Sequence, residues 1–405
     1  MKKTIVLLGR LDSKGKEYAY VKDQMVRGDF DVIVVDTGTR GAPQFEPDIS
    51  REEVARAAGV KIEDVVDPVD ENKEIRVMME GASKIAQRLR DSGKLDGIMC
   101  LGGSRGTAIG TAAMRALPFG IPKVMVSTIA SGDMRPYIGT KDITLVHSVT
   151  DIVGLNRMTK RLLACAAGAV MGAVAADPGP EVSDKPLIAM SSMGGINRAV
   201  FSAQKILEDK GFEVVAFHTV GTGGQAMEDA VQQGLIDGVL DLVTHEVMDH
   251  LYGGYFDAGP ARLEAAGRKG IPQVIVPGCL DFIVFSPPEK IPESLRERKV
   301  HRHTPEVAIV RANKDEMASA GKTIAEKLNR ALGPIVVVVP NQGFSPANRR
   351  GKALYDPEAD KAFVEVLRQN LKPSIRIVEL DAHINDELFA KRAVELLCEL
   401  MQKRA

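Results

Sequence analysis

Short runs of β-branched residues alternate with amphipathic helical patterns along most of the chain, and this alternation limits the possible folds more than any other feature. The first example is a strand expected at 4–9, a helix at about 14–27 and a strand at 31–36. Strands joined through helices are typical of parallel sheets, because a parallel crossover needs a long connection. The alternation therefore predicts an α/β fold with doubly wound, Rossmann-like domains and mainly parallel sheets. In such sheets ligands bind at the carboxyl ends of the strands.

The length and one change of composition predict two domains. A chain of 405 residues exceeds the roughly 250–300 residues at which a single core stops growing. Three prolines and one glycine fall within 177–186, which is the composition of a linker. We therefore predict one α/β domain at 1–180 and a second at 181–405.

The charge balance and the cysteines disfavour several classes of partner and location. Lys and Arg number 53 against 54 Asp and Glu, a formal net charge of -1, so the chain has no electrostatic reason to bind nucleic acid or an anionic membrane. The four cysteines are far apart and form no CxxC pair, which fits a reducing cytoplasm. The longest uncharged run, 162–176, is shorter than the roughly 20 residues that span a bilayer. We expect it to be a close-packed core helix of a cytoplasmic protein.

A glycine-rich turn joins a strand to a helix in the first domain. The apolar run 97–101 ends at the sequence GGSRGT, 102–107, and small and apolar residues then recur at helical spacing. Glycines permit positive φ angles that direct successive N–H groups into one concavity, and the following helix directs its positive dipole end to the same place. Such a turn binds phosphate or carboxylate. It matches neither GxxxxGK[ST] nor GxGxxG, and a tight turn whose glycines serve only packing is the alternative.

Three further loops, 10–14, 36–38 and 127–133, follow predicted strands of the first domain. Because the carboxyl ends of parallel strands meet at one edge, we expect all four loops to surround one small anionic ligand. The carboxylates at 12, 36 and 133 could hold a ribose or a hydrated Mg²⁺, or could only cap helices and turns. The candidate binding residues are Arg10, Asp12, Lys14, Thr37, Gly102, Gly103, Ser104, Arg105, Gly106, Thr107, Ser127, Thr128, Ser131, Gly132 and Asp133.

The second domain has a similar turn with titratable groups beside it. The strand expected at 213–217 is followed by His218, by glycines at 221, 223 and 224, and by Glu228, which we place in the first helical turn. This pattern predicts a second anion-binding turn next to a candidate general base. A buried, hydrogen-bonded core histidine is the alternative. The loop 193–197 is a similar turn that would neighbour the first if the two strands are adjacent.

The other histidines give less definite signals. His245 and His250 stand five residues apart in HEVMDH, about 140° around a helix, so they cannot share one ion as the histidines of HExxH do. His245 and Asp249 could share one, but a solvated polar face is the first interpretation, and we predict no metal centre there. We expect at most one of His301 and His303 to enter a site. His383 precedes the last helix, where capping by its neighbours is the first interpretation.

The order of these motifs resembles a largely bacterial family of Tm-one-like ATP-binding proteins, related to the N-terminal domain of a tomato mosaic virus resistance protein. The resemblance covers nearly the whole chain. Arg105 stands where the family has a glycine, and Arg10 and Ser13 also depart from its pattern. The motifs that carry the resemblance are 10–14, 102–107, 127–133, 136–139, 154–156, 217–228, 280–281, 303 and 383–386.

The resemblance implies that the first domain binds ATP. It also adds His303 and His383 to His218 and Glu228 as candidate catalytic residues. We expect a small anionic substrate in a cleft between the domains, and a homo-oligomer. Two activities remain open: an ATP-dependent or metal-assisted transformation of a carboxylate metabolite, or nucleotide-gated binding without turnover.

Overall fold

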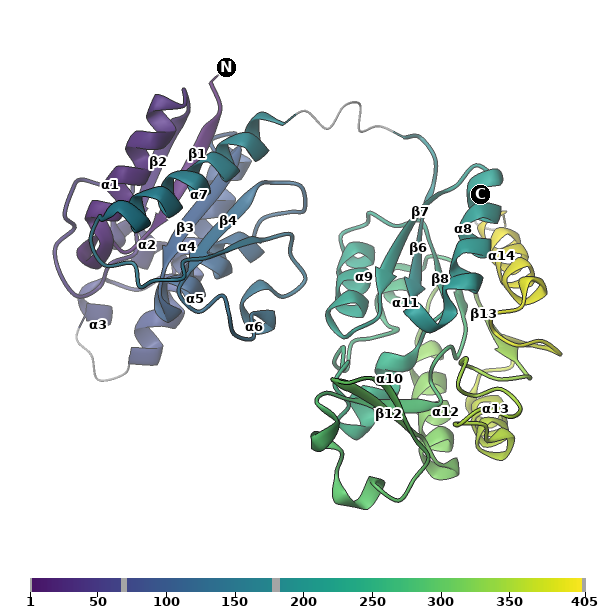
Figure 1. Cartoon of the computed structure of the whole chain (residues 1–405). Helices are drawn as coiled ribbons and strands as arrows, with labels where there is room; N and C mark the ends of the chain where they lie inside the picture. Colours follow the sequence, from purple (N-terminus) through teal and green to yellow (C-terminus); the bar gives the residue numbers. More distant parts are fainter. Residues whose placement is uncertain (1, 67–70, 177–182, 403–405) are drawn as a thin grey trace. The chain divides into compact units, whose positions relative to one another are not determined.

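The chain folds into two compact units. A computed structural model describes residues 2–66, 71–176 and 183–402 (Figure 1). The N-terminal unit comprises Met1–Glu181 and the C-terminal unit Val182–Ala405. Residues 177–182 of the predicted linker lie outside the described residues. Each unit is a doubly wound α/β domain built on a parallel sheet, as the alternation of patterns predicts.

The N-terminal unit is built on a five-stranded parallel sheet in the order β2-β1-β3-β4-β5. Its strands are β1 (Thr4–Gly9), β2 (Asp31–Asp36), β3 (Gly97–Gly102), β4 (Lys123–Ser127) and β5 (Thr144–His147). β1 pairs with β2 on one side and with β3 on the other, so the chain reverses its direction across the sheet between β1 and β3. Doubly wound sheets bind ligands at the carboxyl ends of the strands that flank such a reversal.

Helices cover both faces of this sheet. They are α1 (Leu11–Arg27), α2 (Arg51–Ala57), α3 (Glu63–Val66), α4 (Glu71–Asp91), α5 (Ser104–Arg115), α6 (Arg135–Ile138) and α7 (Arg157–Ala175). Leu7 points to the face covered by α1 and α7, and Leu8 to the face covered by α2, α4 and α5. Because successive strand residues point to opposite, equally buried faces, β1 is apolar along its whole length.

The uncharged run of the sequence forms most of α7. Its inner face brings Leu163, Ala167 and Val170 into the core. By length and composition α7 could also cross a membrane. Core helices of soluble proteins can have the same length and composition, and 33% of the most apolar 18-residue segment of α7 is buried inside the protein. The prediction of a close-packed core helix is therefore correct for one face only, since Cys165 and Gly172 on the other face are exposed.

The C-terminal unit contains a six-stranded parallel sheet in the order β14-β13-β9-β8-β6-β7. Its strands are β6 (Leu187–Ser192), β7 (Glu213–His218), β8 (Gly238–Asp241), β9 (Gln273–Ile275), β13 (Ile335–Pro340) and β14 (Arg376–Leu380). Met190 faces the helices on one side and Ala189 those on the other. β6 and β7 are neighbours, so the loops 193–197 and 218–224 start side by side.

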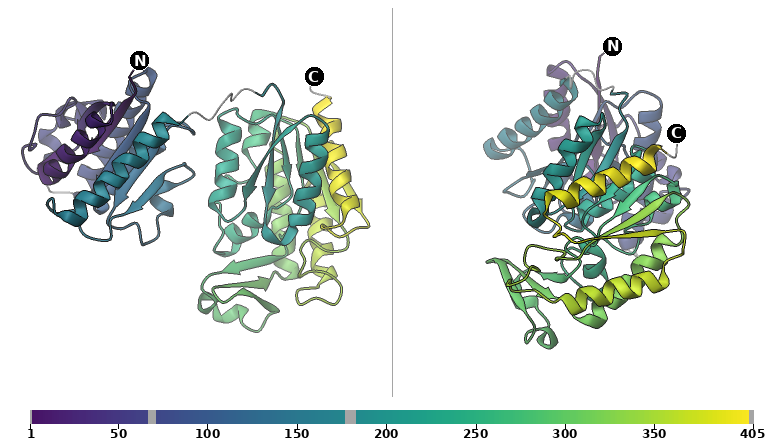
Figure 2. Two further views of the ribbon diagram at one scale, coloured as in Figure 1. Left: turned by 45° about the horizontal axis from the view of Figure 1, so that its top comes forward. Right: turned by 90° about the vertical axis from the view of Figure 1, so that its right-hand side faces the viewer.

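Seven helices accompany the described part of this sheet. They are α8 (Asn197–Asp209), α9 (Thr222–Gln232), α10 (His245–Tyr252), α11 (Ala265–Lys269), α12 (Lys314–Leu328), α13 (Pro357–Asn370) and α14 (Glu387–Gln402). α8 and α14 cover one face, where Figure 2 shows α14 in yellow, and α9, α11, α12 and α13 cover the other.

A second, three-stranded antiparallel sheet belongs to the same unit. Its order is β10-β12-β11, with β10 at Phe282–Phe285, β11 at Val300–Thr304 and β12 at Val307–Arg311. β12 is central, and β11 is an edge strand whose residues are all exposed. Side chains of this sheet and of the carboxyl edge of the larger sheet line one common pocket.

Candidate functional site

A pocket of about 230 Å³ lies at the carboxyl ends of β1 and β3. Two of the four loops that we expected at this edge meet there. Its lining residues are Arg10, Ser13, Lys14 and the run from Leu101 to Gly106. The Nζ of Lys14 donates a hydrogen bond to the backbone oxygen of Ile152, which fixes the lysine at the rim. The pocket thus carries positive charge at the place where a doubly wound sheet binds ligands.

The glycines of this turn serve close packing and not an unusual backbone conformation. Gly102, Gly103 and Gly106 all have negative or extended φ angles, so the positive-φ turn expected from the sequence is wrong. A Cβ on Gly102 would lie 3.0 Å from the Cα of Gly106, so the glycines let α5 begin directly against β3. α5 starts at Ser104 without a side-chain cap. Its first N–H groups are therefore available to an anion.

Asp12 connects the loop after β1 to the loop after β2. Its Oδ2 accepts hydrogen bonds from the backbone N–H groups of Thr39 at 3.0 Å and Arg40 at 2.9 Å, and from the guanidinium of Arg10 at 3.2 Å. Burial raises the pKa of Asp12, but the hydrogen bond from Arg40 and the charge of Arg10 lower this pKa more, so the carboxyl is ionised. Asp12 therefore shapes the edge of the site and does not line the pocket.

Asp36 and Thr37 are buried beside this connection. Asp36 Oδ1 accepts hydrogen bonds from the N–H groups of Leu11 and Gly38, at 3.0 and 2.8 Å. Burial raises the pKa of Asp36 despite these bonds. Among the described residues, Asp36 Oδ2, Thr37 Oγ1, Asp12 Oδ1 and Arg10 Nε are buried without a hydrogen-bond partner. Buried polar atoms are nearly always paired, so four such atoms in one place indicate a bound group or water.

The remaining expected ligand residues of this unit lie outside the pocket lining. Thr107 and Ser127 are buried and their hydroxyls hydrogen-bond to each other at 2.7 Å, which joins α5 to β4. Thr128 donates its N–H to Gly102, and Ser131 and Gly132 are exposed. Asp133 is also exposed and pairs with Arg135 at 2.7 Å, and hydrogen bonds from Arg135 lower the pKa of Asp133 to about 2. The fourth loop therefore supports the site and does not form it.

In the C-terminal unit the glycine turn after β7 is filled by the protein itself. Gly221 has a φ of 86°, as expected for such a turn. Its N–H and that of Gly224 donate to Glu246 Oε1, at 2.7 and 3.1 Å. A Cβ on Gly224 would lie 1.8 Å from the same carboxylate. The prediction that this turn binds a ligand anion is therefore wrong, because a carboxylate of α10 occupies it.

Glu228 belongs to the same buried network and is not in a pocket. It lies in the middle of α9 and accepts hydrogen bonds from the N–H groups of Leu263, Glu264 and Ala265, and from Arg262. These donors occupy its carboxylate oxygens and Glu228 lines neither pocket, which argues against the catalytic role expected for it and favours a structural one.

Arg262 is the centre of this network. Its guanidinium contacts Asp241 at 2.6 Å and Glu246 at 2.7 Å, and Glu228 at 3.3 Å. The side chain is 1% exposed. Burial lowers the pKa of Arg262, but the charges of Asp241 and Glu246 raise it well above its usual value.

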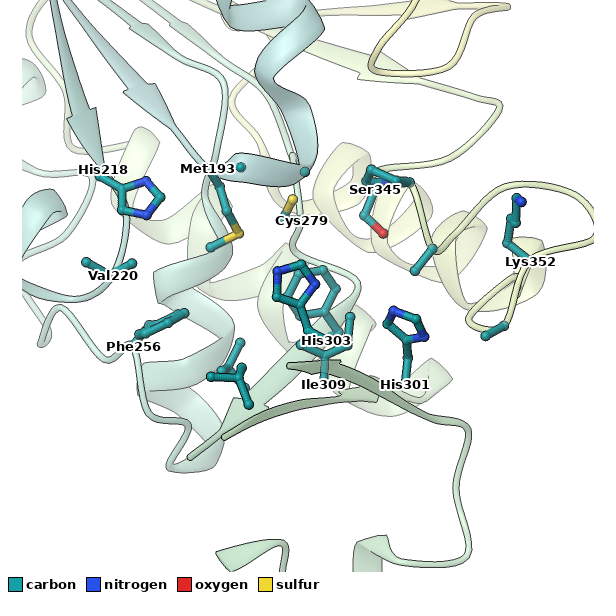
Figure 3. A pocket seen from close by; sticks show the side chains of 18 residues that line it. Met193, His218, Val220, Phe256, Cys279, His301, His303, Ile309, Ser345 and Lys352 are labelled. Carbon is teal, nitrogen blue, oxygen red and sulfur yellow. The ribbon is translucent and has the colours of Figure 1, made fainter. Parts of the chain in front are cut away.

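A larger pocket, of about 590 Å³, lies between the carboxyl edge of the six-stranded sheet and the antiparallel sheet. Its buried floor is mostly apolar and includes Phe282, Val284 and Ile309. His218, His301 and His303 are exposed and form its rim, as Figure 3 shows. Within the described part of the chain, the imidazole of His218 has no hydrogen-bond partner.

Both His301 and His303 line this pocket, and the prediction that at most one would do so is wrong. Residues two apart in a strand point to the same side, so β11 presents both imidazoles together. Figure 3 shows the two rings directed toward Cys279 and Ser345. Cys279 is buried, and burial raises the pKa of its thiol well above the usual value, which favours the protonated thiol over the thiolate.

His383 fixes the backbone and does not enter the larger pocket. Its Nδ1 accepts a hydrogen bond from the N–H of Asn385 at 3.2 Å, so its Nε2 carries the proton that is donated to the backbone oxygen of Ser345 at 3.0 Å. Both ring nitrogens are used, which leaves none for proton transfer. We therefore reject the catalytic role expected for His383. Its ring does border a hollow of about 360 Å³ beside the pocket.

His245 is likewise internal. Its Nε2 lies 3.2 Å from the carboxylate of Asp249, its Nδ1 lies 3.2 Å from the backbone oxygen of Cys279, and the imidazole is completely buried. Burial lowers the pKa of His245, but the charge of Asp249 raises it to above its usual value. Within the described ranges, no group of three or more His, Cys, Asp or Glu is placed to hold a metal ion.

The fold and these pockets define an α/β protein of two doubly wound units, each with a pocket at the carboxyl edge of its parallel sheet. The chain belongs to the uncharacterised protein family UPF0261. The N-terminal domain of that family matches residues 3–178 and its C-terminal domain matches residues 185–401.

Relatives support the assignment over the whole length. A UPF0261 protein of Clostridium tetani is 43% identical over 404 residues, which cover 100% of both chains. The ToMV resistance protein Tm-1(GCR237) of Solanum lycopersicum is 37% identical over 336 residues, which cover 81% of this chain and 45% of that protein. The family resemblance inferred from the motifs is thus confirmed. Among solved structures, MurG of Acinetobacter baumannii covers 99% of both chains with 11% identity and a TM-score of 0.23, too low to support any argument.

Proposed function

We propose that the N-terminal unit binds ATP, with its phosphates in the pocket between β1 and β3. The observation that carries this proposal is the uncapped amino end of α5, which opens into a pocket lined by Arg10, Lys14 and Arg105. Backbone N–H groups and a helix dipole favour a phosphate, and cationic side chains add charge-assisted hydrogen bonds. The choice of ATP is supported by the resemblance of 10–14, 102–107 and 127–133 to the Tm-one-like ATP-binding family.

The size of the pocket agrees with a phosphate group and not with a whole nucleotide. Pockets that enclose an organic ligand measure roughly 300–1,000 Å³, whereas this one measures about 230 Å³. The base and ribose would then extend along the strand ends.

Mg²⁺ bound with the ATP fits Asp36 and Asp12, since Asp36 Oδ2 and Asp12 Oδ1 are buried oxygens without a protein partner. Mg²⁺ prefers such oxygens together with phosphate and water. It would supply a charge that neutralises the phosphates, and it would favour the ionised form of Asp36, whose pKa burial raises.

We propose that the C-terminal unit takes a small anionic substrate in its larger pocket, with His218 as general base and His303 beside it. A histidine needs little pKa change to act near neutral pH. The same pocket would serve equally well in a nucleotide-gated binding module without turnover. We propose a cytoplasmic location, which agrees with the four free cysteines.

A thermal-shift experiment tests the nucleotide proposal. ATP at 100 times its Kd should stabilise the protein by about 2.7 kcal/mol, which raises the Tm of a unit of this size by roughly 5–10 °C. Arg105→Ala should weaken ATP binding by about 1.5–3 kcal/mol. Lys84→Ala, on the exposed side of α4, is the control and should leave the shift unchanged. Absence of a shift with ATP, ADP and GTP at millimolar concentration would refute the proposal.

A further inference from the structure

The larger pocket of the C-terminal unit is suited to an apolar body. Its volume of about 590 Å³ falls within the range of organic-ligand pockets. Phe282, Val284 and Ile309 form a buried floor, and Phe256 and Val220 continue the apolar wall. A ligand made only of polar groups would leave this wall in contact with water, so the floor selects for a hydrocarbon or aromatic portion.

The hollow beside this pocket is suited to an anion. The two cavities share Gly194, Gly195, Pro346 and Lys352, so they adjoin each other. The hollow adds Arg198 and Arg349 to Lys352. Within the described residues, these three cations have no carboxylate partner, and no Asp or Glu lines either cavity. Arg and Lys side chains gathered without a counter-charge favour a carboxylate or phosphate.

The walls of the hollow are held in place by internal hydrogen bonds. Asn385 Nδ2 donates to the backbone oxygen of Gly195 at 2.9 Å, and His383 Nε2 donates to that of Ser345. These bonds tie the loop after β14 to the loop after β6 and to the loop after β13. Asn385 Oδ1 is buried there without a protein partner. Such an atom indicates that a donor group of a ligand or a water completes the site.

We propose that the C-terminal unit binds an amphipathic anion, whose apolar body fills the histidine-rimmed pocket and whose carboxylate or phosphate lies among Arg198, Arg349 and Lys352. This inference rests on the proposed function of the C-terminal unit and specifies its substrate class. It places the reactive part of the ligand, between body and charged end, in the cavity that His218, His301 and His303 border. His383 and Asn385 are then positioning residues.

A matched ligand series tests both halves of the proposal on the full chain. Octyl phosphate, octanoate, octanol and inorganic phosphate would be titrated by calorimetry. Octyl phosphate or octanoate should bind at least tenfold more tightly than octanol, which lacks the charge, and than inorganic phosphate, which lacks the apolar body. Equal binding of octanol would overturn the anion site, and equal binding of inorganic phosphate would overturn the apolar one. The tighter of the two anions identifies the charged group.

Variants locate the site. Arg198→Gln and Arg349→Gln remove exposed cations of the hollow, and each should weaken the bound anion about tenfold while octanol binding stays unchanged. Arg350→Gln is the matched control, because Arg350 is exposed, adjacent in sequence and outside the lining of either cavity. The same loss in Arg350→Gln as in Arg349→Gln would overturn the proposed position.

The increase in Tm caused by ATP distinguishes this inference from the nucleotide proposal. It should persist in Arg198→Gln and Arg349→Gln. If the shift persists but none of the octyl ligands binds, the amphipathic-anion site is refuted and the nucleotide site stands. If Arg349→Gln abolishes the ATP shift while Arg105→Ala keeps it, the hollow binds ATP, and both proposals are refuted.

Discussion

Arg262 is completely buried among three carboxylates, Asp241, Glu246 and Glu228, which come from β8, α10 and α9. The arginine neutralises charges that could not remain buried alone. Breaking a buried ion pair by removing one partner costs about 3–5 kcal/mol, because the partner's charge is left uncompensated. The cluster therefore determines whether these three elements stay together.

We predict that Arg262→Met destabilises the protein by about 3–5 kcal/mol, measured by chemical denaturation at pH 8. Burial already raises the pKa of Glu246, and loss of the arginine raises it further. A carboxyl with a raised folded-state pKa binds a proton more tightly in the folded state than in the unfolded state. The loss of stability caused by Arg262→Met should therefore become smaller as the pH falls. Arg268→Met is the control, since its pair with Glu264 is on the surface, where pairs contribute less than about 1 kcal/mol. An equal loss in both variants would contradict this account.

The buried carboxyl of Asp360 should make the stability of the protein depend on pH in a second way. Burial raises its pKa to about 7, although Arg311 at 2.6 Å opposes the change. An unfolded aspartate titrates near 3.9. The stabilisation from the protonated folded form is therefore complete below about pH 4 and is lost as the pH rises to about 7.

We predict that the stability of the natural protein relative to Asp360→Asn falls by about 3 kcal/mol between pH 4.5 and 7.5. Urea denaturation at several pH values measures this difference. Asp133→Asn is the control: Asp133 is exposed and titrates at about 2, so its difference from the natural protein should be nearly constant over this range. A constant difference for Asp360→Asn would show that Asp360 is ionised throughout.

Residue chemistry explains why part of the site could not be predicted from sequence. The glycines at 221, 223 and 224 are visible in the chain, but Glu246, which fills their turn, follows some 20 residues later on another helix. Glu228 and His383 likewise look reactive until their backbone partners are known. By contrast, Arg10, Lys14 and 102–106 could be placed together, because the carboxyl ends of neighbouring parallel strands must meet.

At the scale of elements, helix α9 depends on the absence of side chains at its start. A Cβ on Gly224 would lie 1.8 Å from Glu246 Oε2. We predict that Gly224→Ala separates α9 from α10 and destabilises the protein by at least about 2 kcal/mol, measured by thermal denaturation. Gly168→Ala in α7, where a Cβ would meet nothing within 4 Å, should instead stabilise by about 0.5–1 kcal/mol. Destabilisation of equal size in both variants would contradict the close contact.

The elements that the sequence predicts well are those with apolar faces. Both parallel sheets follow from the alternation of strands and helices. The pattern also predicts a strand at 307–311, but not β10 or β11 on either side of it. β11 reads VHRHT and is exposed along its length, so no hydrophobic period marks it. Only its pairing with β12 makes it a strand.

At the scale of the molecule, the two pockets lie in different units, one in the N-terminal and one in the C-terminal. We predict that His218→Asn leaves the ATP-induced Tm shift unchanged. If the protein is an enzyme, the same variant should lower kcat by about 10²–10⁴-fold, the usual contribution of one acid or base. Lys205→Asn on α8, outside both pockets, is the control. Full turnover in His218→Asn would exclude its role as base, and loss of the ATP shift would show that the two sites are one.

The pocket wall that carries His301 and His303 is an edge strand, hydrogen-bonded on one side only, to β12. A strand held by a single ladder opens more often than the interior of the six-stranded sheet, because fewer bonds break and little apolar surface is exposed. His301 and His303 therefore lie on a fully exposed edge strand, while the floor residues lie on β10 and on the central strand β12, where they are buried. Local opening of β11 would move these two histidines while β10 and β12, which carry the floor, stay paired with each other.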